Sequence, residues 1–178
     1  MGYLLLILLS CVSSTGTQGI STSVPSPVVE AFVIGKPVQK AEWDIKPNIR
    51  ICTSTELLIS RVGRAVAYWE RLGYKFDDIY KDYFSTCMNP KYGEIIITIP
   101  STDFGSQHMA STRIYTSNKT GKIVMAKIYI IPKNGRKERV LEHELGHTLG
   151  WSHYNQRTHM MHPTWRYGGY DSFGLRKR

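Results

Sequence analysis

The stretch that decides the fold of this 178-residue chain is HELGHTLGWSH, at positions 143–153. His143 and His147 are four positions apart, so on a helix their imidazoles project from one face and can reach a single metal ion. Gly150 is suited to end that helix, because a residue without a Cβ adopts the left-handed conformation at little cost. The turn would return His153 to the metal as a third ligand, which leaves one coordination position for water, as in catalytic zinc sites.

Glu144 follows the first histidine and lies at the edge of the same helix face. Its carboxylate is placed to accept a proton from a water molecule that zinc activates, and to pass this proton to a leaving amine. The stretch therefore predicts one catalytic zinc ion and hydrolysis of internal peptide bonds, with Glu144 as general base. A bare His-Glu-x-x-His pattern also arises by chance, but five of the six histidines fall within 143–162, and chance gives no reason for that concentration.

These eleven residues match the signature of the metzincin zinc peptidases, and the sequence resembles their matrixin branch most closely. The family places a methionine turn beneath the metal. Here one residue separates Met161 from Pro163, as in matrixins. The resemblance implies an α+β fold with a twisted mixed sheet, an edge strand over the cleft, two main helices and a short carboxyl-terminal subdomain that holds the methionine turn. It also implies that 163–165 walls the pocket for the substrate residue that follows the scissile bond.

Two segments are candidates for contact with the substrate. Pro163 and Trp165 would lie at the wall of that pocket, although packing explains Trp165 equally well. If the fold is as implied, 127–131 is the sheet edge above the cleft, and Ile128 and Tyr129 would face the substrate. An extended peptide could then add to this edge as a further strand.

The remaining sequence has a compatible pattern of strands and helices. Apolar residues recur every three or four positions over 58–72, which predicts a core-facing helix that Thr53 or Ser54 caps and Gly73 ends. Short runs rich in β-branched residues predict strands. We expect strands at 49–52, 93–99, 109–116 and 122–131, and the zinc helix at 136–150.

The amino-terminal region has no charged residue before position 30 and begins with a short apolar run. Residues 1–20 are therefore predicted to be a signal peptide or, because Cys11 ends a lipobox-like sequence, a lipoprotein signal that anchors the chain through a lipid. The run is too short to span a bilayer, which takes ~20 apolar residues. Prolines punctuate 21–42, which favours a linker or an extended arm, and the catalytic domain is expected at 43–178. We expect a secreted or cell-surface protein.

Three cysteines are an odd number. Removal of Cys11 with the leader, or its lipidation, would leave Cys52 and Cys87 as a pair. In an oxidising compartment these two could form a disulfide, whereas in a reducing one they would be buried thiols. The sequence leaves both readings open.

The formal net charge is +9, and no nucleic-acid-binding module is recognisable. The charge favours acidic or cell-wall-associated protein and peptide substrates, or it belongs to an ordinary solvated surface. We expect a monomer with no specific nucleic-acid partner. The alternative functions are a non-catalytic zinc-containing binding lipoprotein and a hydrolase of cell-wall peptides. Ligands for a structural calcium ion cannot be identified, and His159 and His162 have no assigned role, although either could line the cleft.

Overall fold

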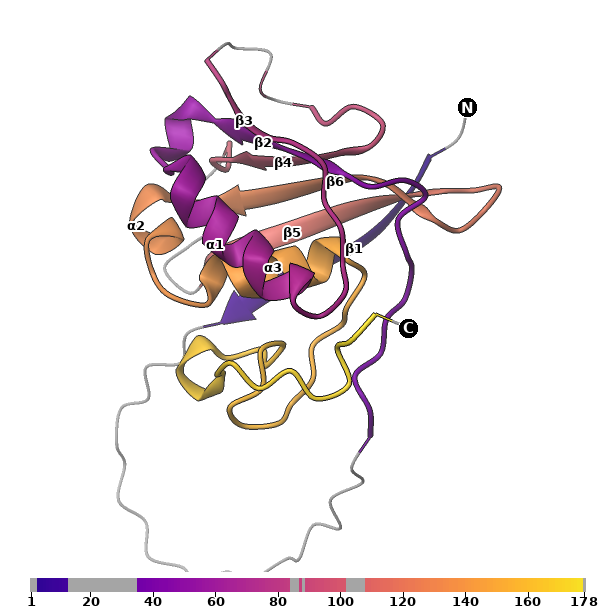
Figure 1. Cartoon of the computed structure of the whole chain (residues 1–178), viewed down its shortest axis with the longest axis vertical. Helices are drawn as coiled ribbons and strands as arrows, with labels where there is room; N and C mark the ends of the chain where they lie inside the picture. Colours follow the sequence, from indigo (N-terminus) through magenta and orange to yellow (C-terminus); the bar gives the residue numbers. More distant parts are fainter. Residues whose placement is uncertain (1–2, 13–34, 84–86, 88, 102–107, 178) are drawn as a thin grey trace, which may run out of the picture.

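The computed structural model describes residues 3–12, 35–83, 87, 89–101 and 108–177, which form a mixed sheet with two main helices on one face (Figure 1). The order of the strands across the sheet is β1-β5-β6-β4-β2-β3. The mixed sheet and the two main helices that the sequence predicted are present. The strands are β1 (Tyr3–Val12), β2 (Asn48–Cys52), β3 (Ile79–Asp82), β4 (Glu94–Thr98), β5 (His108–Ser117) and β6 (Ile123–Ile130).

The centre of the sheet is parallel, and one side of it is antiparallel. β2 pairs in parallel with both β3 and β4, and β4 pairs in parallel with β6. β5 is antiparallel to β6 on one side and to β1 on the other. A short turn joins β5 to β6, as antiparallel neighbours allow, whereas each parallel connection needs a longer crossover.

The first main helix, α1 (Ile59–Glu70), begins later than its sequence predicted. A cap at Thr53 or Ser54 is wrong, because these residues belong to a single 3-10 turn, η1 (Thr53–Thr55). The Thr55 hydroxyl donates a hydrogen bond of 2.7 Å to a backbone carbonyl three residues earlier and so closes the turn locally. Hydroxyl side chains compete with helix formation in this way.

The zinc helix, α3 (Val140–Thr148), is also shorter than expected, because a separate short helix, α2 (Pro132–Gly135), precedes it. Arg139 stands directly before α3 with a φ of 67°, in the left-handed region. The side chain of Asn134 donates a hydrogen bond of 2.9 Å to the carbonyl of Met109 and ties α2 to β5. The break at Arg139 therefore allows α2 to contact the end of β5 while α3 follows in a new direction across one face of the sheet (Figure 1).

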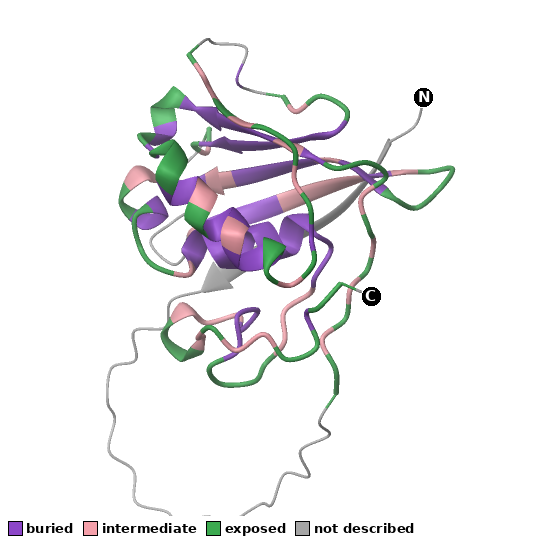
Figure 2. Cartoon of the chain, viewed as in Figure 1, coloured by how far each residue is buried: buried purple, intermediate pink, exposed green. Residues whose placement is uncertain are grey.

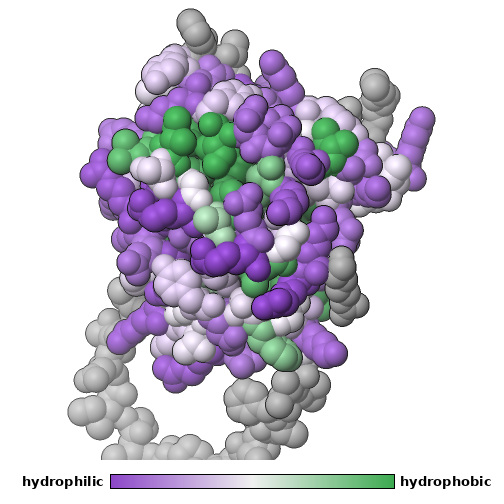
Figure 3. Space-filling model, viewed as in Figure 1, coloured by the Kyte–Doolittle hydropathy of each residue, from purple (hydrophilic) through white to green (hydrophobic). Residues whose placement is uncertain are grey.

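The two faces of the sheet have different neighbours. Successive residues of a strand point to opposite faces, and we call the face covered by α1 and α3 the inner face and the opposite one the outer face. The central strands and α3 are mostly buried, whereas the surrounding loops are largely exposed (Figure 2). The surface seen in the same view is mainly hydrophilic (Figure 3). Fully buried members of the inner core include Ile49, Ile51, Trp69, Ile95, Ile97, Ile128, Leu141 and Leu145.

The prediction that 127–131 forms the sheet edge over the cleft is wrong. β6 lies between β4 and β5 and pairs with both, so its backbone cannot accept another strand. Ile128 is fully buried in the inner core. Tyr129 lies on the outer face, where the Lys127 ammonium is 5.0 Å from its ring centroid. Apolar patterning reports how deeply a strand is buried and not which strands are its neighbours, so it could not distinguish β6 from the strand beside the zinc helix, which is β5.

Part of the predicted leader is a strand of the sheet. β1 runs antiparallel along β5, with Tyr3 opposite Ser117 and Val12 opposite His108 (Figure 1). Within the described residues, no helix is long and apolar enough to cross a membrane. Signal cleavage, export and lipidation at Cys11 remain predictions.

The described part of the predicted linker or arm, from residue 35 onward, is an arm that lies against the domain. The backbone N–H of Lys40 donates to the carbonyl of Gly150 at 2.8 Å, and that of Ser152 donates to the carbonyl of Val38 at 2.9 Å. The arm therefore pairs with the loop that follows α3. Residues 21–34 of the predicted segment lie outside the described residues.

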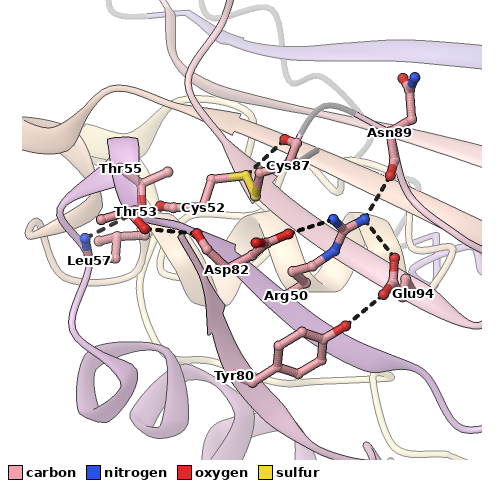
Figure 4. The surroundings of a disulfide bond; sticks show 10 residues. All are labelled: Arg50, Cys52, Thr53, Thr55, Leu57, Tyr80, Asp82, Cys87, Asn89 and Glu94. Atoms are coloured by element: carbon pink, nitrogen blue, oxygen red, sulfur yellow. Dashed lines mark hydrogen bonds and ion pairs between the residues drawn. A yellow bond between two sulfur atoms is a disulfide. The ribbon is translucent and has the colours of Figure 1, made fainter. Parts of the chain in front are cut away.

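The outer face carries a network of buried and partly buried charges (Figure 4). The Arg50 guanidinium donates to Asp82 Oδ2 at 2.9 Å, to Glu94 Oε2 at 2.8 Å and to the carbonyl of Asn89 at 2.7 Å. Tyr80 donates its hydroxyl to the other oxygen of Glu94 at 2.7 Å. The network joins β2, β3 and β4, and its mutual hydrogen bonds offset the cost of removing these charges from water.

Beside this network, Cys52 and Cys87 form a disulfide, with their Cα atoms 5.6 Å apart (Figure 4). Of the two readings that the sequence left open, the structure has the disulfide. Ile96 packs with both cysteines on the outer face. The bond ties the end of β2 to the segment after β3 across 35 positions of sequence, a separation for which a disulfide typically contributes about 2–4 kcal/mol.

Candidate active site

Three histidines come together where α3 ends. His143 and His147 lie one turn apart on α3, every residue of which is buried. Gly150, with a φ of 90°, ends the helix, and the following turn brings His153 back to the other two. The Nε2 atoms are 3.0 Å apart between His143 and His147, 3.1 Å between His147 and His153, and 3.3 Å between His143 and His153.

Hydrogen bonds at the opposite ring nitrogens orient two of these imidazoles. His143 Nδ1 lies 2.8 Å from the carbonyl oxygen of Met160, and His147 Nδ1 lies 2.8 Å from that of Trp151. Because a carbonyl oxygen can only accept, each Nδ1 carries the hydrogen and each Nε2 presents a lone pair. The lone pairs of these two rings therefore point to a common position, beside the third Nε2.

Neutral imidazoles at these distances fit a zinc ion. Burial, assisted by the neighbouring histidines, lowers the pKa of His143 to about 3 and that of His153 to about 4, and lowers the pKa of His147 well below its ordinary value. Zinc–nitrogen bonds of ~2.0–2.1 Å at tetrahedral angles place ligand nitrogens about 3.3 Å from one another. Within the part of the chain that the structure describes, this is the one group of three or more potential ligands with such geometry.

Glu144 is buried beside this cluster, with 1 % of its surface exposed. The hydroxyl of Thr112, on β5, donates a hydrogen bond of 2.6 Å to Glu144 Oε2. Burial raises the pKa of Glu144 to about 8, against the opposing effect of the Thr112 hydrogen bond. A divalent cation next to the carboxylate would favour its ionised form.

Contacts with α1 and with the carboxyl-terminal region fix α3 in place. The Arg61 guanidinium makes two hydrogen bonds to Glu142, of 2.9 and 2.8 Å, and Trp69 Nε1 donates to the Glu142 carbonyl at 2.7 Å. A Cβ at Gly146 would lie 2.4 Å from Met161 Sδ and 2.6 Å from Trp69 Cζ2. The glycine therefore lets Met161, which is fully buried, pack directly against the helix that carries the first two histidines.

The amino-terminal arm fixes the other end of the same helix. The side chain of Gln39 donates a hydrogen bond of 2.8 Å to the carbonyl oxygen of residue 149. The side chain of Trp43 donates one of 2.8 Å to the carbonyl oxygen of residue 148. A Cβ at Gly150 would lie only 2.1 Å from the Ala41 carbonyl oxygen. Gly150 thus serves two purposes, because it adopts the left-handed turn and leaves room for the arm.

A small pocket opens beside His143 and Glu144. Trp165 lines it, and His162 lines it as well. Pro163 is not among its lining residues. The two other candidates for substrate contact, at 128 and 129, belong to β6 and are not among its lining residues.

His159 has a structural position. Its Nδ1 accepts a hydrogen bond of 3.0 Å from the backbone N–H of Met161, and its Nε2 lies 3.0 Å from the carbonyl oxygen of Phe173. The ring is fully buried and packs against Tyr154. His159 therefore joins the segment that holds Met161 to the chain terminus, whereas His162 faces the pocket.

Sequence reasoning missed Thr112 and the Arg61–Glu142 pair. Thr112 lies between Ala110 and Ile114 on the inner face of β5, so a hydroxyl interrupts an otherwise apolar face. That interruption is a usable signal, because a buried hydroxyl needs a hydrogen-bond partner. The Arg61–Glu142 pair gave no comparable signal, since charged residues on predicted helices ordinarily face water.

Comparison with known proteins agrees with this geometry. The sequence profile of the matrixin family matches residues 53–178, which is well over half of the chain. No curated protein and no solved structure matches it significantly. The matched region contains the histidine cluster, Glu144, Thr112 and both main helices, and on this evidence the chain belongs to the matrixin family.

Proposed function

We propose that this matrixin is a zinc-dependent endopeptidase in which His143, His147 and His153 hold the ion and Glu144 is the general base. One observation carries the proposal: three imidazole Nε2 atoms lie 3.0–3.3 Å apart next to a buried carboxylate. Matrixins are zinc metallopeptidases, so membership of the family supports the same reaction class. Zinc held by these three imidazoles would supply Lewis-acid catalysis and would lower the pKa of a water molecule.

The residues of the chain supply the proton transfers. Glu144 accepts a proton from the attacking water and returns it to the amine that leaves the scissile peptide bond. Thr112, by its hydrogen bond to Oε2, restricts the carboxylate to one orientation. Each of His143 and His147 is held by a backbone carbonyl at Nδ1, so neither ring has to reorient during the reaction.

We place the substrate along β5. Extended peptides bind exposed sheet edges by main-chain hydrogen bonds, and β5 already accepts β1 as an antiparallel partner. Thr112, at the centre of this pairing, is opposite Leu9 of β1 and also contacts Glu144. A substrate at the same edge would cross the site beside the general base, and removal of residues 1–20 as a signal would expose that edge.

We also assign the methionine turn to Met161, and the pocket lined by Trp165 to the substrate residue that follows the scissile bond. The close packing of Met161 on Gly146 supports the first assignment. The second rests on the pocket's position beside His143 and Glu144. On this proposal, the segment after His153 is a small carboxyl-terminal subdomain that supports the zinc site from below and walls the pocket.

Export and substrate class are further proposals. An oxidising compartment agrees with the disulfide between Cys52 and Cys87, so we propose a secreted or cell-surface monomer, with Cys11 as a candidate lipid anchor. The net charge of +9 supports an acidic or cell-wall-associated protein or peptide substrate. A zinc protein that only binds its partner would not need a buried carboxylate next to the ligands.

Replacement of Glu144 by alanine tests the proposal. The Glu144→Ala variant should keep one zinc per chain and lose about 10²–10⁴-fold of its casein-cleaving activity, the range that general-base catalysis contributes. Glu138→Ala, an exposed carboxylate just before α3, is the matched control and should cleave casein normally. Full activity in Glu144→Ala would remove Glu144 from the mechanism, and absence of casein cleavage by the zinc-loaded wild type would overturn the proposed activity.

A further inference from the structure

The pocket beside the zinc site has basic and hydrogen-bond-donating groups on a largely apolar wall. Its apolar lining includes Met109, Val140 and Met160, and its polar lining includes Arg139 and His162. The carboxylate of Glu144 is the one acidic group among its lining residues. An apolar pocket with a few placed donors discriminates between ligands mainly through those donors.

Arg139 is held at the pocket wall by three observed features. Its Nη1 donates a hydrogen bond of 3.1 Å to the carbonyl of Trp165, and its guanidinium lies 5.0 Å from the Trp165 ring centroid. A Cβ at Gly168 would lie 3.1 Å from the same Nη1, so the glycine leaves room for the guanidinium. Trp165 and Gly168 also line the pocket, which places the guanidinium among its lining groups.

The backbone of Arg139 is strained as well. Its φ of 67° is in the left-handed region, which is unfavourable for a residue with a side chain. This conformation sets the residue directly before α3, four positions ahead of His143. Strain of this kind is retained where the surrounding structure fixes it, often at ligand-binding positions.

His162 adds a second polar group to the lining. Its Nδ1 lies 3.0 Å from the backbone nitrogen of Thr164 and 3.1 Å from the Thr164 carbonyl oxygen, so the backbone of Thr164 holds this side of the ring. Burial lowers the pKa of His162, which favours the neutral ring. With Nδ1 engaged by the backbone, Nε2 is the ring nitrogen left to interact with a ligand in the pocket.

We infer that this pocket selects an acidic side chain, glutamate or aspartate, at the substrate residue immediately after the scissile bond. The methylene groups of such a residue match the apolar wall, and its carboxylate matches the Arg139 guanidinium, which can bind both oxygens at once. The bound zinc ion would offset repulsion from Glu144. This inference rests on the proposed peptidase function and gives it a substrate class, in agreement with the net charge of +9.

The test uses quenched fluorescent peptides that differ only after the scissile bond, with Glu, Gln, Leu or Lys at that position. The wild type should cleave the Glu peptide with the highest kcat/KM. In Arg139→Gln the Glu-to-Leu ratio of kcat/KM should fall about tenfold or more, the effect of one charge-assisted hydrogen bond. A ratio measured within one variant is independent of how much of that variant is folded.

Arg136→Gln is the matched control, because Arg136 is 71 % exposed and pairs with Glu56 on the surface. It should leave the Glu-to-Leu ratio unchanged. Arg139→Lys should give an intermediate ratio, since lysine keeps the charge and loses the two-pronged geometry. A wild type that cleaves the Leu peptide as well as the Glu peptide, or a ratio that Arg139→Gln does not change, would overturn the inference and leave the peptidase function intact.

A binding measurement separates this inference from the proposed function. The zinc-loaded Glu144→Ala protein should bind the Glu peptide more tightly than the Leu peptide in fluorescence anisotropy, and Arg139→Gln in that background should abolish the difference. If the wild type cleaves no peptide, the peptidase proposal fails. The binding comparison still decides whether the pocket selects an acidic side chain. Equal binding of the two peptides would refute the selection of an acidic residue.

Discussion

The inner and outer faces of one sheet hold their polar groups in opposite ways. On the outer face, Arg50 is matched by Asp82 and Glu94, and each charge has a partner of opposite sign. On the inner face, the histidine Nε2 atoms lie within 3.0–3.3 Å of each other with lone pairs directed at a common position. The charges of the outer network pair with one another, whereas the arrangement of the inner cluster fits a cation.

This difference teaches how to separate structural from functional polar groups in a buried region. A set of charges that satisfy one another indicates a contribution to stability or specificity of the fold. A set of neutral acceptors that face one another indicates a ligand, because imidazole lone pairs gain nothing from mutual contact. The two faces should therefore respond differently to mutation and to pH.

The largest expected effect concerns the stability of the fold, and it tests the outer face. Arg50→Ala leaves the buried Glu94 and the partly buried Asp82 without their cation and should lower the free energy of unfolding by about 3–5 kcal/mol. The folded fraction should still bind zinc, because Arg50 lies on the opposite face from the histidines. Guanidinium chloride unfolding and zinc content per folded molecule measure the two quantities.

Arg136→Ala is the control for Arg50→Ala. Its ion pair with Glu56 is exposed, with 71 % and 63 % of the two side chains accessible, and exposed pairs contribute about 0–1 kcal/mol. Equal effects of the two variants on stability would show that the outer network is not the stabilising feature described above.

A smaller effect should be confined to the inner face. Thr112→Val removes the hydrogen bond to Glu144 Oε2 at nearly constant volume and should lower kcat about tenfold, with little change in KM. Zinc content and the unfolding midpoint should stay close to the wild type. Thr112→Ser should restore most of the activity, because it keeps the hydroxyl, and a fully active valine variant would contradict the orienting role of Thr112.

The smallest expected effect is on the pH dependence of stability, through the carboxylate of Glu94. Burial of Glu94 opposes its ionisation, but hydrogen bonds from Tyr80, from the backbone N–H of Lys91 and from Arg50 prevail and lower its pKa. A carboxyl with a lowered pKa in the folded state stabilises the protein above its unfolded pKa, and this contribution disappears as the pH falls through the folded pKa. Thermal unfolding of the wild type and Glu94→Gln should therefore differ at pH 7, and the difference should shrink as the pH falls below the ordinary glutamate pKa of about 4.3 and through the lower folded-state pKa. A difference that persisted unchanged at low pH would contradict this assignment.

The contrast also explains how much could be predicted from the sequence. The histidine cluster is encoded locally, because helix spacing and one glycine determine how His143, His147 and His153 meet. The disulfide partners followed from counting cysteines, although their oxidation state did not. The two main helices and most strands followed from apolar patterning.

What the sequence could not predict depends on which strands are neighbours. The edge strand was assigned to β6 and is wrong, since the strand beside the zinc helix is β5. Thr112 and Glu144 are 32 positions apart, and Arg50 and Glu94 are 44 positions apart. β3 is only four residues long and too weakly patterned to be expected, so the network that it completes was also missed.

The most direct test of the central claim is the metal content and coordination of the purified protein. Native mass spectrometry should show one zinc per chain, and X-ray absorption should show three imidazole nitrogens at ~2.0–2.1 Å from it. His153→Ala should weaken zinc binding strongly while His162→Ala retains the ion. A wild-type protein without stoichiometric metal, or one whose zinc is bound equally well without His153, would contradict the account.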